Sequence, residues 1–408
     1  MIKKILFSSL MSLAAVLANA RQAELAATFV FGLNVTNSTP TNVYSMERGS
    51  GFEPGAVLET GGNYVTSDKP FSFSVKLAEG NYHVMLKLGA NDTASTNAVK
   101  CEARRLLWED ARSESGSHVT RTFTVNIRTP NIAGGSNVKL KAREKESEMI
   151  SWDDKLTLEF LGARPGLQGI TITRAVDAPT VFITGDSTVC DQPREPWNSW
   201  GQMLPRFFGL GIAVANYAQS GESIKSSLGA RRFDKVFSEM KTNDWLFVQF
   251  GHNDMKDKAT NALAVYKMNL KMIVAQTRAK GATPVLVTSM ERKTGVERDT
   301  LAGYPDTVRE VAKEDGVALI DLHATSKVFY RALGPNLDQA FQDGTHHNNY
   351  GSYELARCVV EGIRTNVPVL ARYLADDVGK FDPARPDSPD EFTMAVSPAV
   401  DAQKPDGN

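Results

Sequence analysis

The strongest constraint on the fold is a change of pattern after Asp177-Ala178-Pro179. From this point, short runs of apolar and often β-branched residues alternate with stretches of helical periodicity. The apolar runs are 180–184, 212–217, 245–250, 284–288 and 317–320, and the helical stretches are 262–280, 303–315 and 350–365. Apolar runs of this length are typical of strands in a parallel sheet that helices cover on both faces. The segment predicts a doubly wound α/β domain, whose functional site forms beyond the carboxyl ends of the strands.

The region before this change, residues 28–176, has a different pattern. Its apolar residues alternate with polar ones, as in 71–77, 82–88 and 122–127, and Gly, Pro and Asn separate the runs. This pattern predicts an antiparallel β-sandwich of the jelly-roll type. A chain of 408 residues is long enough for two domains with separate cores. We therefore expect an accessory β-sandwich at 28–176, separable from catalysis on small substrates, and an α/β catalytic domain at 177–374.

The N-terminus has the pattern of a signal peptide. Lys3 and Lys4 precede an apolar run at 5–17, and Ala18-Asn19-Ala20 follows it as a cleavage site. A signal peptide at 1–20 predicts a protein that is exported to the periplasm or secreted. The apolar run is too short to span a bilayer, so we expect no membrane anchor at this end.

The last segment of the chain, residues 375–408, is rich in Asp and Pro. Such a composition cannot form a core of its own. We expect this tail either to be disordered or to lie across the catalytic domain, with Phe381 and Phe392 as its anchors.

The net charge of the chain limits its partners. The formal charge is -1 at pH 7, which argues against nucleic acid or an anionic membrane surface as the main partner. The three cysteines, Cys101, Cys190 and Cys358, have no metal-ligand spacing. We expect buried thiols, although one disulfide is compatible with export, and we expect a monomer.

Four short segments in the α/β region carry the residues of a serine esterase. They are Gly185-Asp186-Ser187-Thr188, Ser220-Gly221, Gly251-His252-Asn253-Asp254 and Asp343-Gly344-Thr345-His346. Ester hydrolysis by this route needs a nucleophile, a base, a group that holds the base in one tautomer, and donors for the oxyanion. Together, and in this order, the segments contain every one of these parts.

Ser187 is the candidate nucleophile. It follows the apolar run 180–184, in a turn where we expect a helix to begin. A serine in such a turn is often only a helix cap. The turn also offers backbone N–H donors and the positive end of a helix dipole, which would stabilise an oxyanion.

The candidate base and its orienting acid are His346 and Asp343. Their spacing allows the carboxylate to reach Nδ1 of the imidazole, so that Nε2 faces the serine. His347 is the obvious rival of His346. A metal site is a further alternative, but Asp343, His346 and His347 offer no fourth ligand at a conventional spacing, so we expect no metal and no cofactor.

The oxyanion donors are expected to be the N–H groups of Ser187 and Gly221 and the side-chain amide of Asn253. His252 and Asp254 would brace the Asn253 loop, and His252 is also a candidate substrate contact. Aromatic residues near the predicted mouth of the site could stack on sugar rings, although such residues are as often part of a core. The candidates of this kind are Trp197, Trp200 and Tyr217.

The order and wording of the four segments resemble the SGNH (GDSL-type) hydrolase superfamily, and more narrowly its rhamnogalacturonan acetylesterase branch. In that branch the blocks read GDST, GHND and D-x-x-H, and the resemblance covers residues 180–374. It implies a flavodoxin-like three-layer domain with a parallel sheet. The family spacing between acid and base favours His346 over His347, which would then be a substrate contact or a helix-start residue. Residues 77–82 resemble a galactose-binding-like jelly roll.

One departure from the family pattern concerns the second block. The family often has Gly-Arg-Ser, whereas here Gly221 is followed by Glu222 and Ser223. An arginine could pair with the carboxylate of a galacturonate, but a glutamate would repel it. Glu222 is therefore a candidate substrate contact. The missing positive charge would have to come from Lys225, Arg231 or Lys256.

The resemblance implies an exported serine carbohydrate esterase that removes acetyl groups from a pectic polysaccharide. Rhamnogalacturonan is the expected substrate, and an acetyl-serine is the expected intermediate. Two alternatives stay open. The first is an esterase or lipase acting on other acyl esters or on another acetylated glycan. The second is a non-catalytic glycan-binding protein, because one fold can host many functions.

Overall fold

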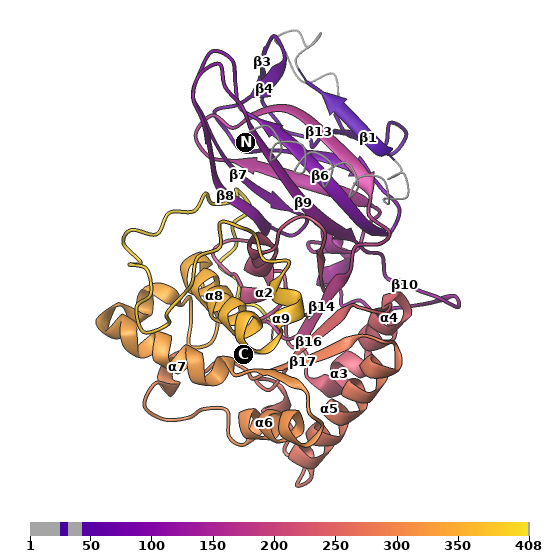
Figure 1. The fold of residues 1–408 in the computed structure, drawn as a ribbon, viewed down its shortest axis with the longest axis vertical. Helices are drawn as coiled ribbons and strands as arrows, with labels where there is room; N and C mark the ends of the chain where they lie inside the picture. Colours follow the sequence, from indigo (N-terminus) through magenta and orange to yellow (C-terminus); the bar gives the residue numbers. More distant parts are fainter. Residues whose placement is uncertain (1–24, 32–42, 407–408) are drawn as a thin grey trace, which may run out of the picture.

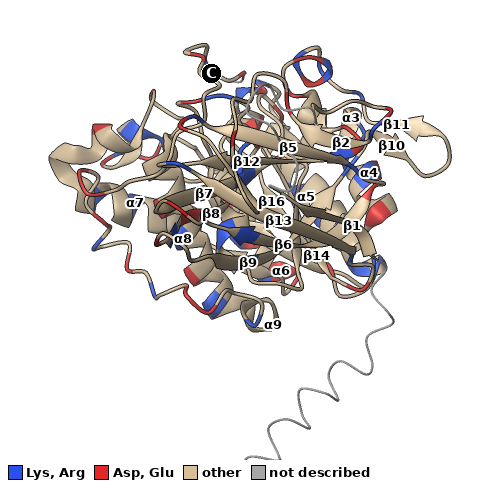
Figure 2. Ribbon diagram, turned by 90° about the horizontal axis from the view of Figure 1, so that it is seen from above, with Lys and Arg blue, Asp and Glu red and all other residues tan. Residues whose placement is uncertain are grey.

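The computed structural model describes residues 25–31 and 43–406, so the predicted signal peptide at 1–20 lies outside the described residues. The protein has a β-sandwich stacked on one end of an α/β domain (Figure 1). Lys and Arg are interspersed with Asp and Glu over the ribbon (Figure 2). None of the helices in the described part is long and apolar enough to cross a membrane.

The α/β domain is built on a five-stranded parallel sheet, as the sequence predicts. Its strands are β14 (Thr180–Gly185), β15 (Ala213–Asn216), β16 (Trp245–Gln249), β17 (Thr283–Val287) and β18 (Ala318–Ile320). Their order in the sheet is β15-β14-β16-β17-β18, and every pair is parallel. This is the flavodoxin-like order, in which the direction of winding reverses next to β14. Sites in such sheets form at this reversal, beyond the carboxyl ends of the strands.

Helices cover both faces of this sheet. They are α2 (Trp200–Met203), α3 (Ile224–Gly229), α4 (Arg232–Glu239), α5 (Ala262–Ala279), α6 (Tyr304–Glu314), α7 (Leu322–Leu333), α8 (Asn349–Asn366) and α9 (Pro368–Ala371). Side chains of a strand point alternately to opposite faces. In β14, Val181 and Ile183 pack into the core under α2, α7 and α8, while Phe182 packs into the core under α4, α5 and α6. The three predicted helices correspond to α5, α6 and α8.

The N-terminal part is an antiparallel β-sandwich, as predicted. The first sheet has the order β3-β4-β13-β6-β9, with β1 paired to β13, and the second has the order β2-β5-β12-β7-β8. The strands are β1 (Leu25–Val30), β2 (Ser50–Phe52), β3 (Glu59–Gly61), β4 (Tyr64–Thr66), β5 (Phe71–Lys76), β6 (Gly80–Leu88), β7 (Ser95–Cys101), β8 (Arg105–Ser113), β9 (Val119–Ile127), β12 (Lys155–Leu161) and β13 (Gly166–Arg174). Their inward-facing apolar side chains form one core between the sheets.

Short elements complete the fold. A small ribbon is formed by β10 (Asn131–Ile132) and β11 (Ser136–Asn137). The 3-10 helices are η1 (Arg143–Lys145), η2 (Met149–Ser151), η3 (Leu204–Phe207), η4 (Asp254–Lys256), η5 (Lys293–Gly295) and η6 (Gly334–Ala340). The segment that carries η1 and η2 belongs to the N-terminal half of the chain, but it packs against the α/β domain. Trp152, at the end of this segment, lies in the same core as Phe182.

The tail lies across the α/β domain, which is one of the two alternatives that the sequence leaves open. Phe381 is 8% exposed and joins the core under α8. The ring of Phe392 packs on Tyr350 and Tyr353, with ring centroids 5.4 and 5.5 Å away. Both phenylalanines therefore anchor the tail. Cys101, Cys190 and Cys358 are free and buried, as expected.

Candidate active site

The Ser187 turn begins where β14 ends. The backbone oxygen of Asp186 accepts hydrogen bonds from the N–H groups of Val189 and Cys190, both at 3.0 Å. The Asp186 carboxylate accepts from the backbone and the hydroxyl of Thr188 at 2.9 and 2.7 Å. A Cβ on Gly185 would lie 2.7 Å from a carbonyl oxygen of β16, so this position needs glycine. Together these contacts fix the backbone on both sides of the serine.

The structure corrects one expectation about this turn. The sequence predicts that a helix begins at Ser187, but residues 187–189 form only a turn. The first helix after it is α2, which begins at Trp200. The Asp186 carboxylate accepts hydrogen bonds from the backbone N–H and the hydroxyl of Thr188 and so forms a local turn. The Thr188 N–H therefore has a partner without a helix. A helix dipole therefore does not act on Ser187, and donors of other loops must stabilise an oxyanion.

Asp343, His346 and Ser187 form a continuous hydrogen-bonded chain, the triad of the site. Nδ1 of His346 lies 2.9 Å from Oδ2 of Asp343, and Nε2 lies 2.8 Å from Oγ of Ser187. The other carboxylate oxygen of Asp343 accepts from the N–H groups of Thr345 and His346, each at 2.7 Å. The loop thereby folds the carboxylate back against the imidazole.

The charge of Asp343 determines the tautomer of His346. Burial alone would raise the pKa of Asp343, but the hydrogen bonds from the side chain and backbone of His346 outweigh it and hold the pKa well below its usual range. An ionised carboxylate can only accept, so Nδ1 of His346 carries the proton. Nε2 is then the nitrogen that accepts the hydrogen bond of the Ser187 hydroxyl, which is the arrangement of a general base.

His347 has a different environment from its neighbour. Its Nε2 lies 2.9 Å from the Tyr330 hydroxyl, and its ring packs on Phe341 with the centroids 4.1 Å apart. Burial, followed by the nearby His346, lowers the pKa of His347 to about 3. The ring is therefore neutral and enclosed by aromatic residues. The prediction that His347 contacts substrate is wrong, because its side chain points into the core.

The three predicted oxyanion donors come from adjacent loops. Gly221 has a φ of 76°, a left-handed conformation that favours glycine. Among the described residues, neither the Ser187 N–H nor the Gly221 N–H donates a hydrogen bond to another group. The Asn253 amide nitrogen donates to the Glu222 carbonyl at 3.1 Å, and its oxygen accepts from Lys256 at 2.9 Å. These two contacts fix the orientation of the amide and tie the two loops together.

His252 and Asp254 brace the Asn253 loop from within. The ring of His252 is buried between the Asp186 carboxylate at 3.3 Å and the Met290 carbonyl at 3.1 Å. Oδ1 of Asp254 accepts from the N–H of Ile224 at the start of α3, at 2.9 Å. Neither side chain faces outward. The prediction of a substrate contact is therefore wrong for His252, whereas bracing of the loop matches the geometry.

Two further predicted substrate contacts are also buried. Tyr217 lies in the core against Trp152 and Phe182. Tyr217 directly follows β15, where the side chain of an aromatic residue can point to either face of the sheet. Here it points into the core that also contains Phe182. Glu222 points inward as well, toward Lys141 at 3.4 Å and Arg232 at 3.7 Å. Its carboxylate is buried between the half-buried Lys141 and the buried Arg232, so its charge does not face a substrate.

Trp197 is the one predicted aromatic contact that lies at the site. Its ring meets the His346 ring edge to face, with the centroids 5.8 Å apart. It also lines a cavity of about 310 Å³ beside the triad, together with Gln192, Arg194, Arg143, Lys404 and Asp406. The other tryptophan considered, Trp200, is fully buried in the core. Trp197 thus forms a wall of the site.

Sequence reasoning missed two groups of residues that touch the triad. The side-chain nitrogen of Gln192 donates to the Ser187 carbonyl at 2.8 Å. Residues 401–406 of the tail lie over the same loops, and Lys404 Nζ is 3.9 Å from Asp343 Oδ2. Both groups are brought to the site by tertiary folding from loops without a recognisable motif. No local pattern identifies them.

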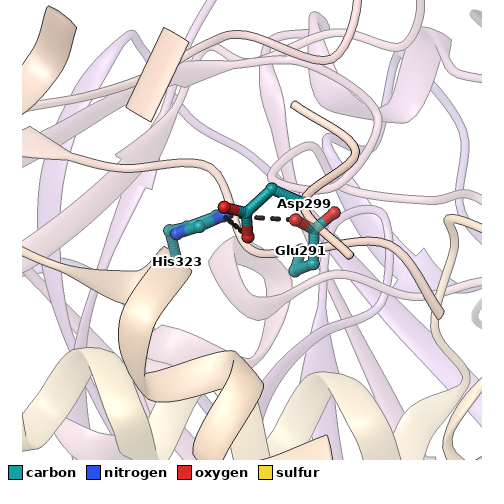
Figure 3. Close-up of side chains that lie close together, drawn as sticks. All are labelled: Glu291, Asp299 and His323. Atoms are coloured by element: carbon teal, nitrogen blue, oxygen red, sulfur yellow. Dashed lines mark hydrogen bonds and ion pairs between the residues drawn. The ribbon is translucent and has the colours of Figure 1, made fainter. Parts of the chain in front are cut away.

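A cluster of possible metal ligands lies beyond β17, formed by Glu291, Asp299 and His323 (Figure 3). Nδ1 of His323 faces an Arg309 nitrogen at 3.1 Å, and Nε2 faces Glu291 at 3.2 Å. Arginine can only donate, so Nδ1 must accept and Nε2 carries the proton. Both ring nitrogens are thus engaged. Burial would raise the pKa of Glu291, but hydrogen bonds from His323 and Thr300 lower it to about 2. The chemistry of this cluster fits an internal hydrogen-bonded network rather than a metal site.

Comparison with known proteins gives consistent matches. Residues 183–352 match the GDSL-like Lipase/Acylhydrolase family. The chain is 35% identical over 222 residues to rhamnogalacturonan acetylesterase RhgT of Bacillus subtilis, a match covering 49% of this chain and 96% of that protein. It is 32% identical over 201 residues to the probable rhamnogalacturonan acetylesterase YesY of the same organism, covering 45% of this chain and 92% of that protein. A third relative, the uncharacterized esterase YxiM of B. subtilis, is 25% identical over 370 residues, covering 82% of this chain and 94% of that protein.

Proposed function

Because this chain belongs to the GDSL-like lipase/acylhydrolase family, we propose that it is a serine carbohydrate esterase that removes acetyl groups from rhamnogalacturonan. The observation that carries the proposal is the unbroken chain from Asp343 through His346 to Ser187, with contacts of 2.9 and 2.8 Å. The pectic substrate is supported by the two relatives named as rhamnogalacturonan acetylesterases. The signal-peptide pattern at 1–20 supports action outside the cytoplasm.

The reaction follows from the geometry of these groups. His346 Nε2 takes the proton of the Ser187 hydroxyl while the oxygen attacks the carbonyl carbon of the acetyl ester. The negative charge that develops on the carbonyl oxygen is stabilised by the N–H groups of Ser187 and Gly221 and by the Asn253 amide. His346 then gives its proton to the sugar oxygen that leaves. Asp343 stabilises the imidazolium that exists between these two transfers.

The second half of the reaction uses the same groups. A water molecule takes the place of the departed sugar hydroxyl, and His346 removes its proton as it attacks the acetyl-serine. The oxyanion donors act again, and Ser187 leaves with the proton held by His346. Acetate is released and the enzyme returns to its starting state. Each step needs only groups of this chain and water.

The test is the release of acetate from several substrates side by side. Acetylated rhamnogalacturonan, acetylated homogalacturonan, acetylated xylan and a nitrophenyl acetate are compared with the wild-type protein, Ser187→Ala and Ser115→Ala. Ser115 lies on an exposed loop of the sandwich and serves as the control. We expect the highest kcat/KM on rhamnogalacturonan and a loss of roughly a thousandfold or more in Ser187→Ala alone. Preference for xylan would contradict the pectic substrate, and an active Ser187→Ala would contradict the mechanism.

A further inference from the structure

The turn of the β7–β8 hairpin inserts from the sandwich into the α/β domain. Glu102 and Arg104 in this turn have positive φ values of 53° and 62°. The Ala103 carbonyl accepts from the Gln202 side chain in α2 at 2.6 Å, and Leu106 is fully buried in the core of the α/β domain. The tip of this hairpin is therefore part of the catalytic domain's packing.

Arg104 holds the loop 191–198 at three points. One guanidinium nitrogen donates to the carbonyls of Gln192 and Trp197, both at 3.0 Å. Another lies 2.6 Å from the Glu195 carboxylate. The side chain of Arg104 is 4% exposed, and the planar guanidinium matches acceptors at fixed angles. The neighbouring Arg105 pairs with Asp191 at 2.6 Å and secures the start of the same loop.

The loop that Arg104 holds contacts both the nucleophile and the base. Gln192 donates its side-chain N–H to the Ser187 carbonyl at 2.8 Å. Trp197 packs its ring on His346. The N–H of Asn198 donates to the His347 carbonyl at 3.0 Å, which ties the loop to the segment carrying the base. A shift of this loop would therefore move Ser187 and His346 relative to each other.

We propose that Arg104 is a positioning residue for the nucleophile and the base, and that the β-sandwich is part of the catalytic unit. This inference rests on the proposed function, because it concerns the rate of the same reaction. It replaces the expectation of a separable accessory domain. Displacements of about 1 Å can lower the rate of an oriented reaction by about a hundredfold. The effect should fall on kcat, because Arg104 does not reach the surface that a substrate would contact.

The test compares Arg104→Met and Arg104→Lys with Arg164→Met as the matched control. Arg164 also belongs to the sandwich and pairs with two acids, Glu59 and Asp68, but it does so at the exposed end. On a nitrophenyl acetate, we expect kcat to fall roughly 10- to 100-fold in Arg104→Met with KM changed by less than about threefold. Arg104→Lys should recover part of the loss, and Arg164→Met should match wild type.

A second variant keeps the test decisive if Arg104→Met does not fold. Gln192→Leu removes the contact with the Ser187 carbonyl without removing a buried charge, and its kcat should also fall about tenfold or more. Wild-type kcat in Gln192→Leu, or in folded Arg104→Met, would overturn the inference. Failure of the proposed function has a different signature, since the wild-type protein itself would then hydrolyse no ester.

A separate observation concerns access to the triad. Ser187 is 2% exposed and His346 is 1% exposed. The tail passes over them after pairing with Glu195, whose N–H donates to the Ala399 carbonyl and whose carbonyl accepts from Asp401, both at 2.8 Å. The indole N–H of Trp197 donates to the Asp401 carbonyl at 3.0 Å. The tail is thus attached to the wall of the site.

Residues 404–406 lie directly over the groups that would hold the ester. Lys404 lies 3.9 Å from Asp343 on the side of the base. Asp406 pairs with Arg143 at 3.3 Å and lies against Gly221 on the side of the oxyanion donors. Pro405, between them, is buried. In this conformation, residues 404–406 cover the approach to Ser187, which is 2% exposed.

We infer that residues 402–406 act as a gate that must move before the substrate reaches Ser187. The test measures how fast phenylmethanesulfonyl fluoride inactivates the full-length protein by modifying Ser187. Lys404→Ala/Asp406→Ala should be modified at least about fivefold faster than wild type, because the ion pairs of the gate with Asp343 and Arg143 are lost. The control Lys380→Ala/Asp382→Ala changes charges of the tail away from the site. Equal rates in all three proteins would overturn the gate, whereas no modification of Ser187 in any of them would instead contradict the nucleophile.

Discussion

At the scale of single residues, the adjacent histidines show how burial and hydrogen bonding separate two side chains of the same type. His346 lies between a carboxylate and a serine hydroxyl. His347 lies between a tyrosine hydroxyl and aromatic rings, where burial lowers its pKa to about 3. Only His346 has both an acid to orient it and a nucleophile to deprotonate.

This difference predicts the ranking of two variants. His346→Ala should lose roughly a thousandfold or more in kcat while remaining folded, because the base is absent. His347→Phe should keep kcat within a few-fold and lose about 1 to 3 kcal/mol of unfolding free energy, because the Tyr330 hydroxyl loses its buried partner. Steady-state kinetics and urea unfolding of both variants check this. A larger loss of kcat in His347→Phe would transfer the role of base to His347.

Glu102, in the hairpin turn next to Arg104, predicts a pH dependence of stability. Burial raises the pKa of the Glu102 carboxyl to about 8, against the attraction of Arg105. The folded protein therefore keeps this proton at pH values where the unfolded chain has released it. Between the two pKa values the folded state binds more protons than the unfolded state, so stability falls as pH rises.

The variant Glu102→Gln removes this titration and keeps the oxygen that accepts from the Thr157 N–H. Its unfolding free energy should equal that of wild type near pH 5 and exceed it by up to a few kcal/mol near pH 9. Guanidinium unfolding at both pH values measures the difference. A difference that does not change with pH would show that Glu102 is already ionised in the folded protein at low pH.

The sequence was sufficient to predict that Ser187, Asp343 and His346 come together, but not the burial of their neighbours. Ser187, Asp343 and His346 belong to short segments whose spacing carries the chemistry. Tyr217 and His252 also lie in or beside such segments, yet their side chains face inward. The direction of a side chain beyond the end of a strand depends on the packing of both faces, which a linear pattern does not contain.

At the scale of elements, the loop that leads into α3 depends on Glu222. This residue lies between Lys141 and Arg232 and accepts a hydrogen bond from Ser226 in α3. Arg232 is in turn paired with Glu144 at 2.6 Å. The negative charge of Glu222 therefore balances the positive charges of Lys141 and Arg232 next to the loop that carries Gly221.

Glu222→Arg should destabilise the protein, because it places a third cation at a buried position beside Lys141 and the buried Arg232. We expect a loss of about 3 kcal/mol or more of unfolding free energy, and an equal loss of activity on charged and neutral esters. Thermal unfolding and assays on acetylated rhamnogalacturonan and a nitrophenyl acetate check both effects. A selective gain on the acidic polymer would instead mean that residue 222 faces the substrate.

The elements themselves were predictable where their pattern is long or strongly apolar. The parallel strands and helices α5, α6 and α8 match the expected positions closely, because burial on both faces leaves few alternatives. The helix expected at Ser187 is absent, since Asp186 forms a local turn and the chain continues as a loop to Trp200. Local hydrogen bonds of this kind compete with a helix without changing the apolar pattern.

At the scale of the whole molecule, the sandwich and the α/β domain share buried contacts. Arg105–Asp191 and Arg104–Glu195 are ion pairs between the two parts, and all four side chains are almost fully buried. The sequence pattern predicts two domains but does not predict this interface, because the residues that pair across it are far apart along the chain. Separating the two parts would leave these charges without partners, which is costly.

Thermal unfolding should therefore occur as a single transition. Differential scanning calorimetry of the full-length protein is expected to show one peak. In Arg105→Met, which leaves Asp191 buried without its partner, the peak should move to lower temperature, and Arg112→Met should not move it because that ion pair is exposed. Two separate peaks in the wild-type protein would show that the sandwich and the α/β domain unfold independently.

The central claim is that Ser187 becomes acetylated during turnover, and mass spectrometry of the peptides from the quenched protein tests it most directly. The wild-type protein is mixed with excess nitrophenyl acetate, quenched in acid within milliseconds and digested. The account predicts that the peptide containing Ser187 gains the mass of one acetyl group, that the gain disappears as substrate is exhausted, and that Ser187→Ala never shows it. An acetyl group on another residue, or rapid turnover in Ser187→Ala, would contradict the account.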